Sequence, residues 1–216
     1  MTDPDYTHAA WIVDRSGSMQ AIVKDMNGAI TATLEDQRSV PGKFSMDVTT
    51  FDHQVEFVGR DLTIDGVLAL MPLVQPRGAT ALFDAIGQTV TNLGEHLAKM
   101  DEVARPAKVL TIIVTDGQEN SSTEWTLAAV NDLITQQREQ WGWDFVFLGA
   151  NMDAVDVAKG MGIPAAGSMT YNTSKAGVAA TSGALSSAMR SYRGPGGQSV
   201  SFSDEDREAA MSEDNA

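Results

Sequence analysis

The stretch VLTIIVTDG, residues 109–117, decides the fold that we predict for this chain. Its first six residues are apolar or β-branched without a break, which is typical of a strand buried on both faces of a parallel sheet. The apolar run then gives way to Asp116 and Gly117, a carboxylate followed by a turn residue. We therefore expect a central strand whose carboxyl end carries an acidic side chain.

Strand and helix patterns alternate on both sides of this stretch. The buried runs AAWIV (9–13) and DFVFLG (144–149) predict two more strands, and alternating residues in KFSMDVTTF and VEFV predict a hairpin. Apolar residues at helical spacing predict helices over residues 19–34, 82–97, about 124–139, from Asp153 onward, and 174–193. This alternation predicts an α/β domain with helices on both faces of a mainly parallel sheet.

We place the domain at residues 1–193 and expect residues 194–216 to form a separate, flexible acidic tail. The stretch RGPGGQSVS resembles a linker, and SDEDREAAMSEDNA is acidic with few apolar residues. Such a segment contributes little to a hydrophobic core.

The composition narrows the classes of partner. A net charge of −14 argues against nucleic acid and anionic membrane surfaces, because phosphate contacts need clustered lysine and arginine. With no cysteine, the 216-residue chain has no disulfide and no thiolate metal site. Its polar N-terminus and the lack of an apolar run of ~20 residues predict a cytoplasmic protein, or a virion-associated one if it is phage-encoded. We take a monomer as the default.

Oxygen ligands gather where the predicted strands end. Asp14 closes the first strand, and Ser16 and Ser18 follow at alternate positions; Thr80 lies on a loop just before a helix. Ligands of open α/β sheets bind outside the carboxyl ends of the strands, so these groups and Asp116 are expected to meet. Oxygen-only sets suit Mg²⁺, Mn²⁺ or Ca²⁺, and water or an incoming carboxylate would complete so sparse a set.

These five residues, as Asp-x-Ser-x-Ser, Gly-Ala-Thr and Thr-Asp-Gly, resemble the metal-ion-dependent adhesion site of the von Willebrand factor type A family. The resemblance is to small stand-alone bacterial and phage members and covers about residues 7–193. It implies a Rossmann-like strand order in which the hairpin supplies one antiparallel edge strand. It also implies that the hydroxyls and carboxylates hold Mg²⁺, with Mn²⁺ or Ca²⁺ as alternatives, and that a partner protein supplies a Glu or Asp to the ion.

Four residues near this site are candidates for a partner-binding rim: Arg15, Arg77, Glu119 and Asn120. The two arginines are otherwise ordinary solvated side chains, and Glu119 and Asn120 could instead cap a helix. In the tail, Glu205 or Asp206 could mimic the partner carboxylate, although a solubilising tail is the simpler interpretation. The histidines His8, His53 and His96 are scattered in sequence and predict no shared site.

The expected function is a non-catalytic, metal-dependent protein-binding module. One alternative is a Mg²⁺-dependent phosphohydrolase, since haloacid-dehalogenase-type phosphatases also begin with an Asp at a strand end. Their second Asp, however, is replaced here by Ser16, and no base is evident beside a nucleophile. Another alternative is a structural or assembly component of a bacterial or phage complex.

Overall fold

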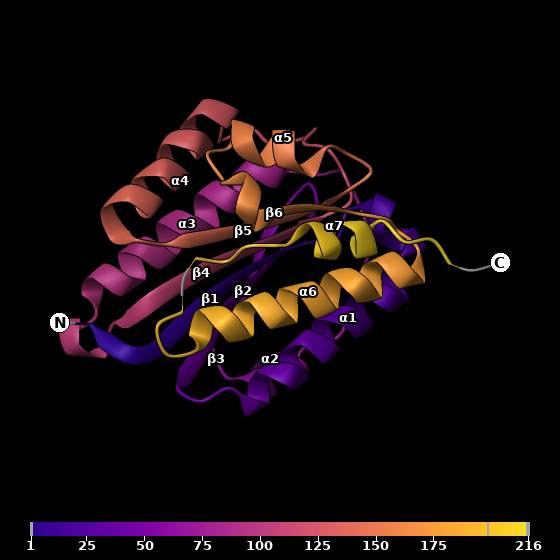
Figure 1. The fold of residues 1–216 in the computed structure, drawn as a ribbon. Helices are drawn as coiled ribbons and strands as arrows, with labels where there is room; N and C mark the ends of the chain where they lie inside the picture. Colours follow the sequence, from indigo (N-terminus) through magenta and orange to yellow (C-terminus); the bar gives the residue numbers. More distant parts are fainter. Residues whose placement is uncertain (1, 198, 215–216) are drawn as a thin grey trace.

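A six-stranded sheet in the order β3-β2-β1-β4-β5-β6 forms the centre of the computed structural model, which describes residues 2–197 and 199–214 (Figure 1). Strand β3 pairs antiparallel with β2, and every other neighbouring pair is parallel. The predicted mainly parallel sheet with one antiparallel edge strand is therefore confirmed. The strands are β1 Asp3–Asp14, β2 Lys43–Phe51, β3 Val55–Leu62, β4 Pro106–Thr115, β5 Asp144–Ala150 and β6 Ser168–Tyr171.

Helices cover both faces of the sheet, as predicted (Figure 1). One face packs against α3 (Leu82–Lys99), α4 (Leu127–Trp141) and α5 (Ala154–Gly160), and the other against α1 (Val23–Asp36), the short α2 (Ile64–Leu68) and α6 (Lys175–Arg193). Successive side chains of a strand point to opposite faces, so each central strand supplies both cores. In β4, Ile112 belongs to the α1–α6 core and Ile113 to the α3–α5 core. This explains the unbroken apolar run that led to the fold prediction.

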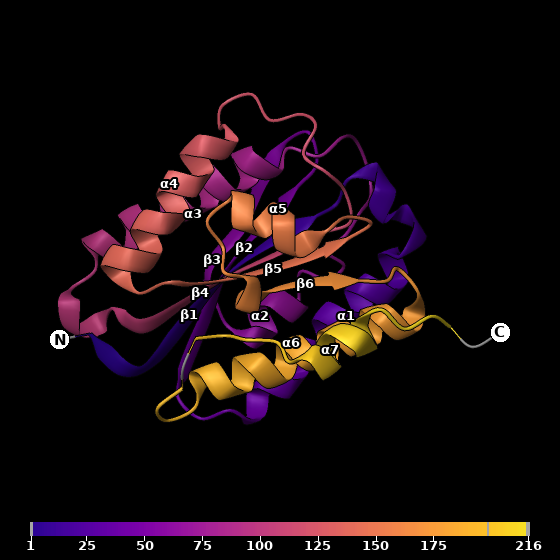
Figure 2. The ribbon, with the colours of Figure 1, turned by 45° about the horizontal axis from the view of Figure 1, so that its top comes forward.

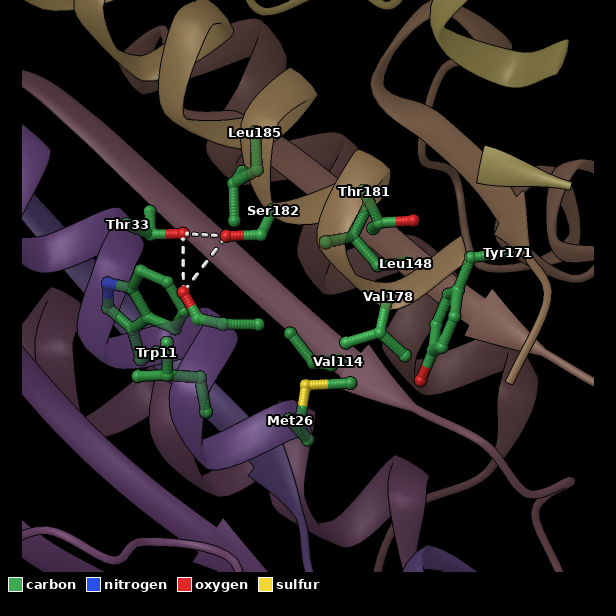
Figure 3. A pocket seen from close by; sticks show the side chains of 12 residues that line it. Trp11, Met26, Thr33, Val114, Leu148, Tyr171, Val178, Thr181, Ser182 and Leu185 are labelled. Atoms are coloured by element: carbon green, nitrogen blue, oxygen red, sulfur yellow. Dashed lines mark hydrogen bonds between the residues drawn. The ribbon is translucent and has the colours of Figure 1, made fainter. Parts of the chain in front are cut away.

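Helices α1 and α6 meet over the sheet through a small polar contact in an apolar setting (Figure 3). Thr33 Oγ1 and Ser182 Oγ lie 2.9 Å apart, and both donate to the carbonyl oxygen of Ala29. A cavity of about 20 Å³ lies beside them, lined by side chains such as Trp11 and Leu185. That volume holds about one water molecule, so this interior gap offers no room for a substrate.

The C-terminal segment differs from the expected flexible tail. Val200 and Phe202 are buried in the α1–α6 core, and α7 (Asp204–Ala210) lies alongside α6 and β6 (Figure 2). The helix begins with a capping box in which the Ser203 and Asp206 side chains bond to each other's backbone N–H. Asp206 is therefore engaged within its own helix. Three apolar residues of this segment, Val200, Phe202 and Ala210, are buried in the α1–α6 core, and so few apolar positions show no periodicity in sequence.

Two short elements also fall outside the predicted pattern. Strand β6 has four residues and α2 has five, which is too few to show a periodicity in sequence. Within the described residues, none of the helices combines the length and apolar character that a membrane crossing requires.

The strand order places the carboxyl ends of β1 and β4 side by side. From β1 the chain proceeds outward to β2 and β3, then returns through α3 to β4 on the other side of β1. The order of strands reverses at this point, where α/β sheets open a crevice for ligands. Asp14 ends β1 and Asp116 follows β4, so both carboxylates reach the same crevice.

Candidate metal centre

Asp14 is the last residue of β1 and is fully buried. Its Oδ1 accepts a hydrogen bond from the backbone N–H of Ser16 at 2.6 Å, and its Oδ2 accepts one from Thr115 Oγ1 at 2.5 Å. Burial raises the pKa of Asp14 to about 6, against the hydrogen bonds from Thr115 and Ser16, and the charge of Asp116 raises it further. Asp14 is thus a rigidly held carboxylate whose negative charge lacks compensation.

Asp116 is the second carboxylate of the site. It is 4% exposed, and its Oδ1 accepts a hydrogen bond from Ser18 Oγ at 2.6 Å. Burial raises its pKa above the ordinary value despite the bond from Ser18. Two buried carboxylates that are costly to ionise together are stabilised by a cation placed between them.

Three hydroxyls complete the cluster, and they surround Gly117. Ser16 Oγ lies 3.0 Å from Ser18 Oγ. A Cβ placed on Gly117 would lie 3.1 Å from Thr80 Oγ1, 3.3 Å from Ser18 Oγ and 3.8 Å from Ser16 Oγ. Gly117 does not have a positive φ, so glycine serves here to leave room between the hydroxyls rather than to permit a turn.

The loop that carries Thr80 is fixed from two sides. Gly17 N–H donates to the carbonyl oxygen of Gly78, which ties this loop to the one after β1. On the other side, the Thr80 N–H donates to Asn120 Oδ1 at 2.9 Å, and the Asn120 N–H donates to the Thr80 carbonyl oxygen at 3.0 Å. The structure thereby brings together all five residues that the sequence predicts as metal ligands. Their donor set, two carboxylates and three hydroxyls, fits a hard divalent cation.

Two of the four predicted rim residues, Glu119 and Asn120, hold loops in place. Glu119 Oε2 accepts from the Phe83 N–H at the start of α3, and Oε1 accepts from the N–H groups of Ser121 and Ser122. Glu119 therefore caps a helix, which is the alternative role considered from the sequence. The capped helix is α3, which precedes Glu119 in the chain. Asn120 is exposed, and its side-chain oxygen is the acceptor for Thr80.

The two arginines are paired with carboxylates rather than free. Arg15 Nε donates to Asp52 Oδ2 at 3.0 Å, and Arg77 Nε donates to the same oxygen at 2.6 Å. Both guanidinium groups also pair with Glu56. Asp52 is fully buried; burial opposes its ionisation, but the bond from Arg77, the Gln54 N–H and the two positive charges together lower its pKa. Arg15 is buried, so only the half-exposed Arg77 side chain faces solvent at the rim.

The sequence interpretation missed the role of Thr115, which follows the predicted strand 109–114, ends β4 in the structure and directly precedes Asp116. Its hydroxyl holds Asp14, and its carbonyl oxygen accepts from the buried Tyr171 hydroxyl at 3.3 Å. Asn151, after β5, has a φ of 55° and donates to the Asp116 carbonyl oxygen at 3.4 Å. The available signal was a threonine, Thr115, directly before the candidate ligand Asp116. Sequence could not identify its partner, because Asp14 belongs to the neighbouring strand β1.

Comparisons with known proteins support the fold. No protein-family model and no curated protein matches the sequence. Among solved structures, the chain is similar to proximal thread matrix protein 1 from the mussel byssus, with a TM-score of 0.62, 17% identity, and coverage of 86% of this chain and 47% of that one. A second structure of that protein has a zinc-occupied metal-ion-dependent adhesion site (MIDAS) motif. It gives a TM-score of 0.56 at 16% identity and covers 77% of this chain and 41% of that one.

Two bacterial structures extend the likeness. A von Willebrand factor type A protein from Catenulispora acidiphila gives a TM-score of 0.61 at 15% identity, covering 87% of this chain and 43% of that one. The vWF domain of the pilus tip protein Mfa5 from Porphyromonas gingivalis gives 0.59 at 11% identity, covering 94% and 99%. The chain thus spans less than half the length of the mussel and Catenulispora structures but nearly all of the Mfa5 domain. It has the von Willebrand factor type A fold.

Proposed function

We propose that the chain is a non-catalytic, metal-dependent protein-binding module. A divalent cation, Mg²⁺ by preference, is held by Asp14, Ser16, Ser18, Thr80 and Asp116, and a Glu or Asp side chain of a partner protein completes its coordination. The observation that carries this proposal is the meeting of two buried carboxylates and three hydroxyls around Gly117, at the carboxyl ends of β1 and β4. The zinc-occupied motif of the mussel protein supports it by likeness of fold.

Each group has a distinct part in the proposed binding. The hydroxyls of Ser16, Ser18 and Thr80 supply neutral oxygen ligands, while Asp14 and Asp116 supply the two negative charges. When bound, the cation offers a positive centre with a replaceable water ligand to an incoming carboxylate. Thr115 and Asn120 position ligands, because they fix the Asp14 carboxylate and the Thr80 loop.

The phosphohydrolase alternative has less support. A nucleophilic Asp must reach a phosphorus atom, but Asp14 is fully buried and both of its carboxylate oxygens accept hydrogen bonds. The strand-end carboxylate is therefore better suited to hold an ion from below than to attack a substrate.

The first experiment is calorimetric titration of the full chain with Mg²⁺ and then Mn²⁺, in the wild type, Asp14→Ala and Asp65→Ala. Asp65 is an exposed carboxylate paired with Arg38, away from the crevice, and serves as the matched control. We expect one saturable site in the wild type and in Asp65→Ala, and none in Asp14→Ala. Equal binding by all three proteins would refute the assigned ligand set.

A second experiment addresses the partner. The wild-type chain and Asp116→Ala are immobilised, exposed to lysate with Mg²⁺ or with EDTA, and the captured proteins are compared. The proposal requires capture that is lost both in EDTA and in Asp116→Ala. Capture of a stable complex that persists in EDTA would instead support an assembly component, and turnover of a phosphate ester abolished by Asp14→Asn would support the enzyme.

A further inference from the structure

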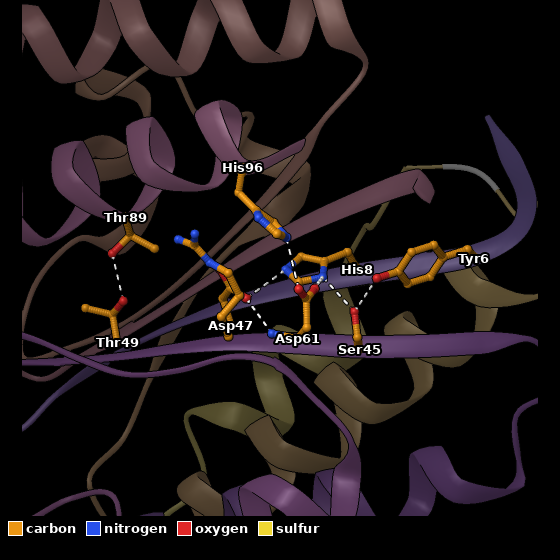
Figure 4. Close-up of polar contacts among 9 residues, drawn as sticks. Tyr6, His8, Ser45, Asp47, Thr49, Asp61, Thr89 and His96 are labelled. Atoms are coloured by element: carbon orange, nitrogen blue, oxygen red, sulfur yellow. Dashed lines mark hydrogen bonds and ion pairs between the residues drawn. The ribbon is translucent and has the colours of Figure 1, made fainter. Parts of the chain in front are cut away.

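A second cluster of ionisable side chains lies nearer the amino end of β1, away from the crevice (Figure 4). His8 of β1, Asp47 of β2 and Asp61 of β3 lie on three adjacent strands, and His96 reaches the cluster from the last turn of α3. A bulge between β2 and β3 and the positive φ of Asp61 let the Asp61 N–H donate to Asp47 Oδ1 at 2.9 Å. Three neighbouring strands thereby bring one imidazole and two carboxylates close together, with Asp47 Oδ1 3.4 Å from His8 Nε2 and Asp61 Oδ1 3.8 Å from His8 Nδ1.

His8 has a nitrogen without a hydrogen-bond partner inside this cluster. The residue is fully buried, and its Nδ1 lies 2.7 Å from Ser45 Oγ, which in turn lies 2.6 Å from the Tyr6 hydroxyl. Its Nε2 makes no hydrogen bond and lies 3.4 Å from Asp47 Oδ1. Buried polar nitrogens normally have a hydrogen-bond partner, so the unpartnered Nε2 of His8 is a candidate atom for binding a ligand.

We propose that His8, Asp47 and Asp61 form a Zn²⁺ site distinct from the centre at Asp14. One potential ligand atom from each residue lies within 4.8 Å of the other two. A tetrahedral zinc ion at ~2.0–2.2 Å from each ligand draws such atoms to roughly 3.5 Å from one another. The Asp61 side chain is 44% exposed, so the small inward movement requires it to shift together with His96 rather than to repack a buried core. Water fills the fourth position, and the imidazole favours Zn²⁺ over Mg²⁺ or Ca²⁺.

Each proposed ligand also has its own outer partner, as ligands of protein metal sites usually do. Ser45 holds His8; Arg60 Nε donates to Asp47 Oδ2 at 3.2 Å; His96 Nε2 lies 2.9 Å from Asp61 Oδ2. Figure 4 shows Asp47 beside one nitrogen of the His8 ring and Ser45 beside the other. Asp61 and the partly exposed His96 provide the route from solvent.

The test uses the full chain with the crevice site removed by Asp14→Ala and Asp116→Ala, so that zinc bound at the first centre does not interfere. Zn²⁺ is titrated in competition with a coloured chelator, and Co²⁺ absorption reports a tetrahedral site. We expect one Zn²⁺ per chain in this background. His8→Asn should weaken binding at least ~100-fold and His96→Gln about tenfold, the range for a ligand and an outer partner. His53→Gln is the matched control, because His53 is the third histidine and lies outside the cluster.

Three results would overturn the site: no saturable Zn²⁺ in this background, the same loss in His53→Gln as in His96→Gln, or unchanged affinity in both Asp61→Asn and His96→Gln. The last two variants alter partly exposed side chains, so they keep the test decisive if the buried His8→Asn variant does not fold. None of these residues belongs to the Asp14 centre. The Mg²⁺ titration of the wild type therefore tests the proposed function separately from this site.

Discussion

Strand β1 carries polar chemistry at two places, and the two clusters are built in different ways. At its carboxyl end, Asp14 meets hydroxyls and a second carboxylate that come from three loops, and every candidate ligand atom is oxygen. In its amino half, His8 meets Asp47 and Asp61 from neighbouring strands, and the cluster combines nitrogen with oxygen. The loop-built cluster is suited to a hard ion that a partner can share, whereas the strand-built one combines two buried residues with the exposed Asp61.

This difference also decides what sequence can reveal. Loop ligands at fixed spacing leave a local motif, as Asp14, Ser16 and Ser18 do. Residues that meet only through strand register leave none, because strand β2 and a bulge lie between His8 and Asp61. If the two clusters are as independent as their construction indicates, a substitution in one leaves the metal affinity of the other unchanged.

The largest expected effect is the loss of Mg²⁺ binding at the carboxyl end alone. Asp116→Ala removes a charged ligand, and we expect Mg²⁺ affinity to fall at least ~1000-fold, or about 4 kcal/mol. Calorimetry measures this loss, while chelator competition follows Zn²⁺ at the His8 cluster. A parallel loss of Zn²⁺ would show that the clusters are coupled.

The second prediction concerns the pH dependence of the metal-free protein in EDTA. The pKa of Asp14 is raised by burial to about 6, so the folded state retains this proton over a pH range in which the unfolded state has released it. Protonated Asp14 contributes to the stability of the folded state below pH ~4, and this contribution is lost as the pH rises to 6. By pH 7 the unfolding free energy is lower by about 3 kcal/mol on this account. Other carboxylates titrate too, so the measurement is the wild type compared with Asp14→Asn.

Denaturant unfolding at pH 4 and pH 7 makes that comparison. We expect Asp14→Asn to be more stable than the wild type at pH 7, with the advantage shrinking towards pH 4. Saturating Mg²⁺ should stabilise only the wild type, since the ion binds the folded state. An identical dependence of unfolding free energy on pH for the two proteins would contradict a raised pKa for Asp14.

The third prediction concerns the polar network around His8, in the amino half of β1, in the absence of metal. Ser45→Ala leaves both His8 Nδ1 and the Tyr6 hydroxyl without their partner, and we expect a loss of about 2 kcal/mol in unfolding free energy. Thr111→Val is a matched control in the same sheet, because the Thr111 hydroxyl is buried and makes no hydrogen bond. Comparable losses in both variants would assign the cost to packing rather than to the polar network.

The smallest expected effect comes from filling the space between the hydroxyls. Gly117→Ala places a methyl group within 3.1 Å of Thr80 Oγ1 and should weaken Mg²⁺ binding about tenfold, or about 1.4 kcal/mol. Gly183→Ala on α6 meets open space and should leave Mg²⁺ affinity unchanged while gaining about 0.5–1 kcal/mol of stability. Unaltered Mg²⁺ binding in Gly117→Ala would show that the hydroxyls can spread without losing the ion.

Sequence reasoning predicted the long periodic elements well, and the residues of the local motif that it singled out lie close together in the structure. The buried run of β4 and the apolar stripe of α3 are strong signals, since many residues repeat one pattern. The same reasoning could not find contacts between distant segments. It placed Arg15 and Arg77 at a rim, whereas Asp52, directly after β2, pairs with both. It also treated His8 and His96 as unrelated, although both lie within 4 Å of Asp61.

The docked C-terminal segment has a consequence for the edge of the sheet. Strand β6 is an outer strand, and this segment covers it: the Asn172 N–H donates to the Ala210 carbonyl oxygen, and Arg207 donates to the Ser168 carbonyl oxygen. An uncovered outer strand is a template for pairing with another chain. A chain cut at Gly194 should therefore self-associate in solution, so solubility after truncation reports on how the sheet is protected from aggregation.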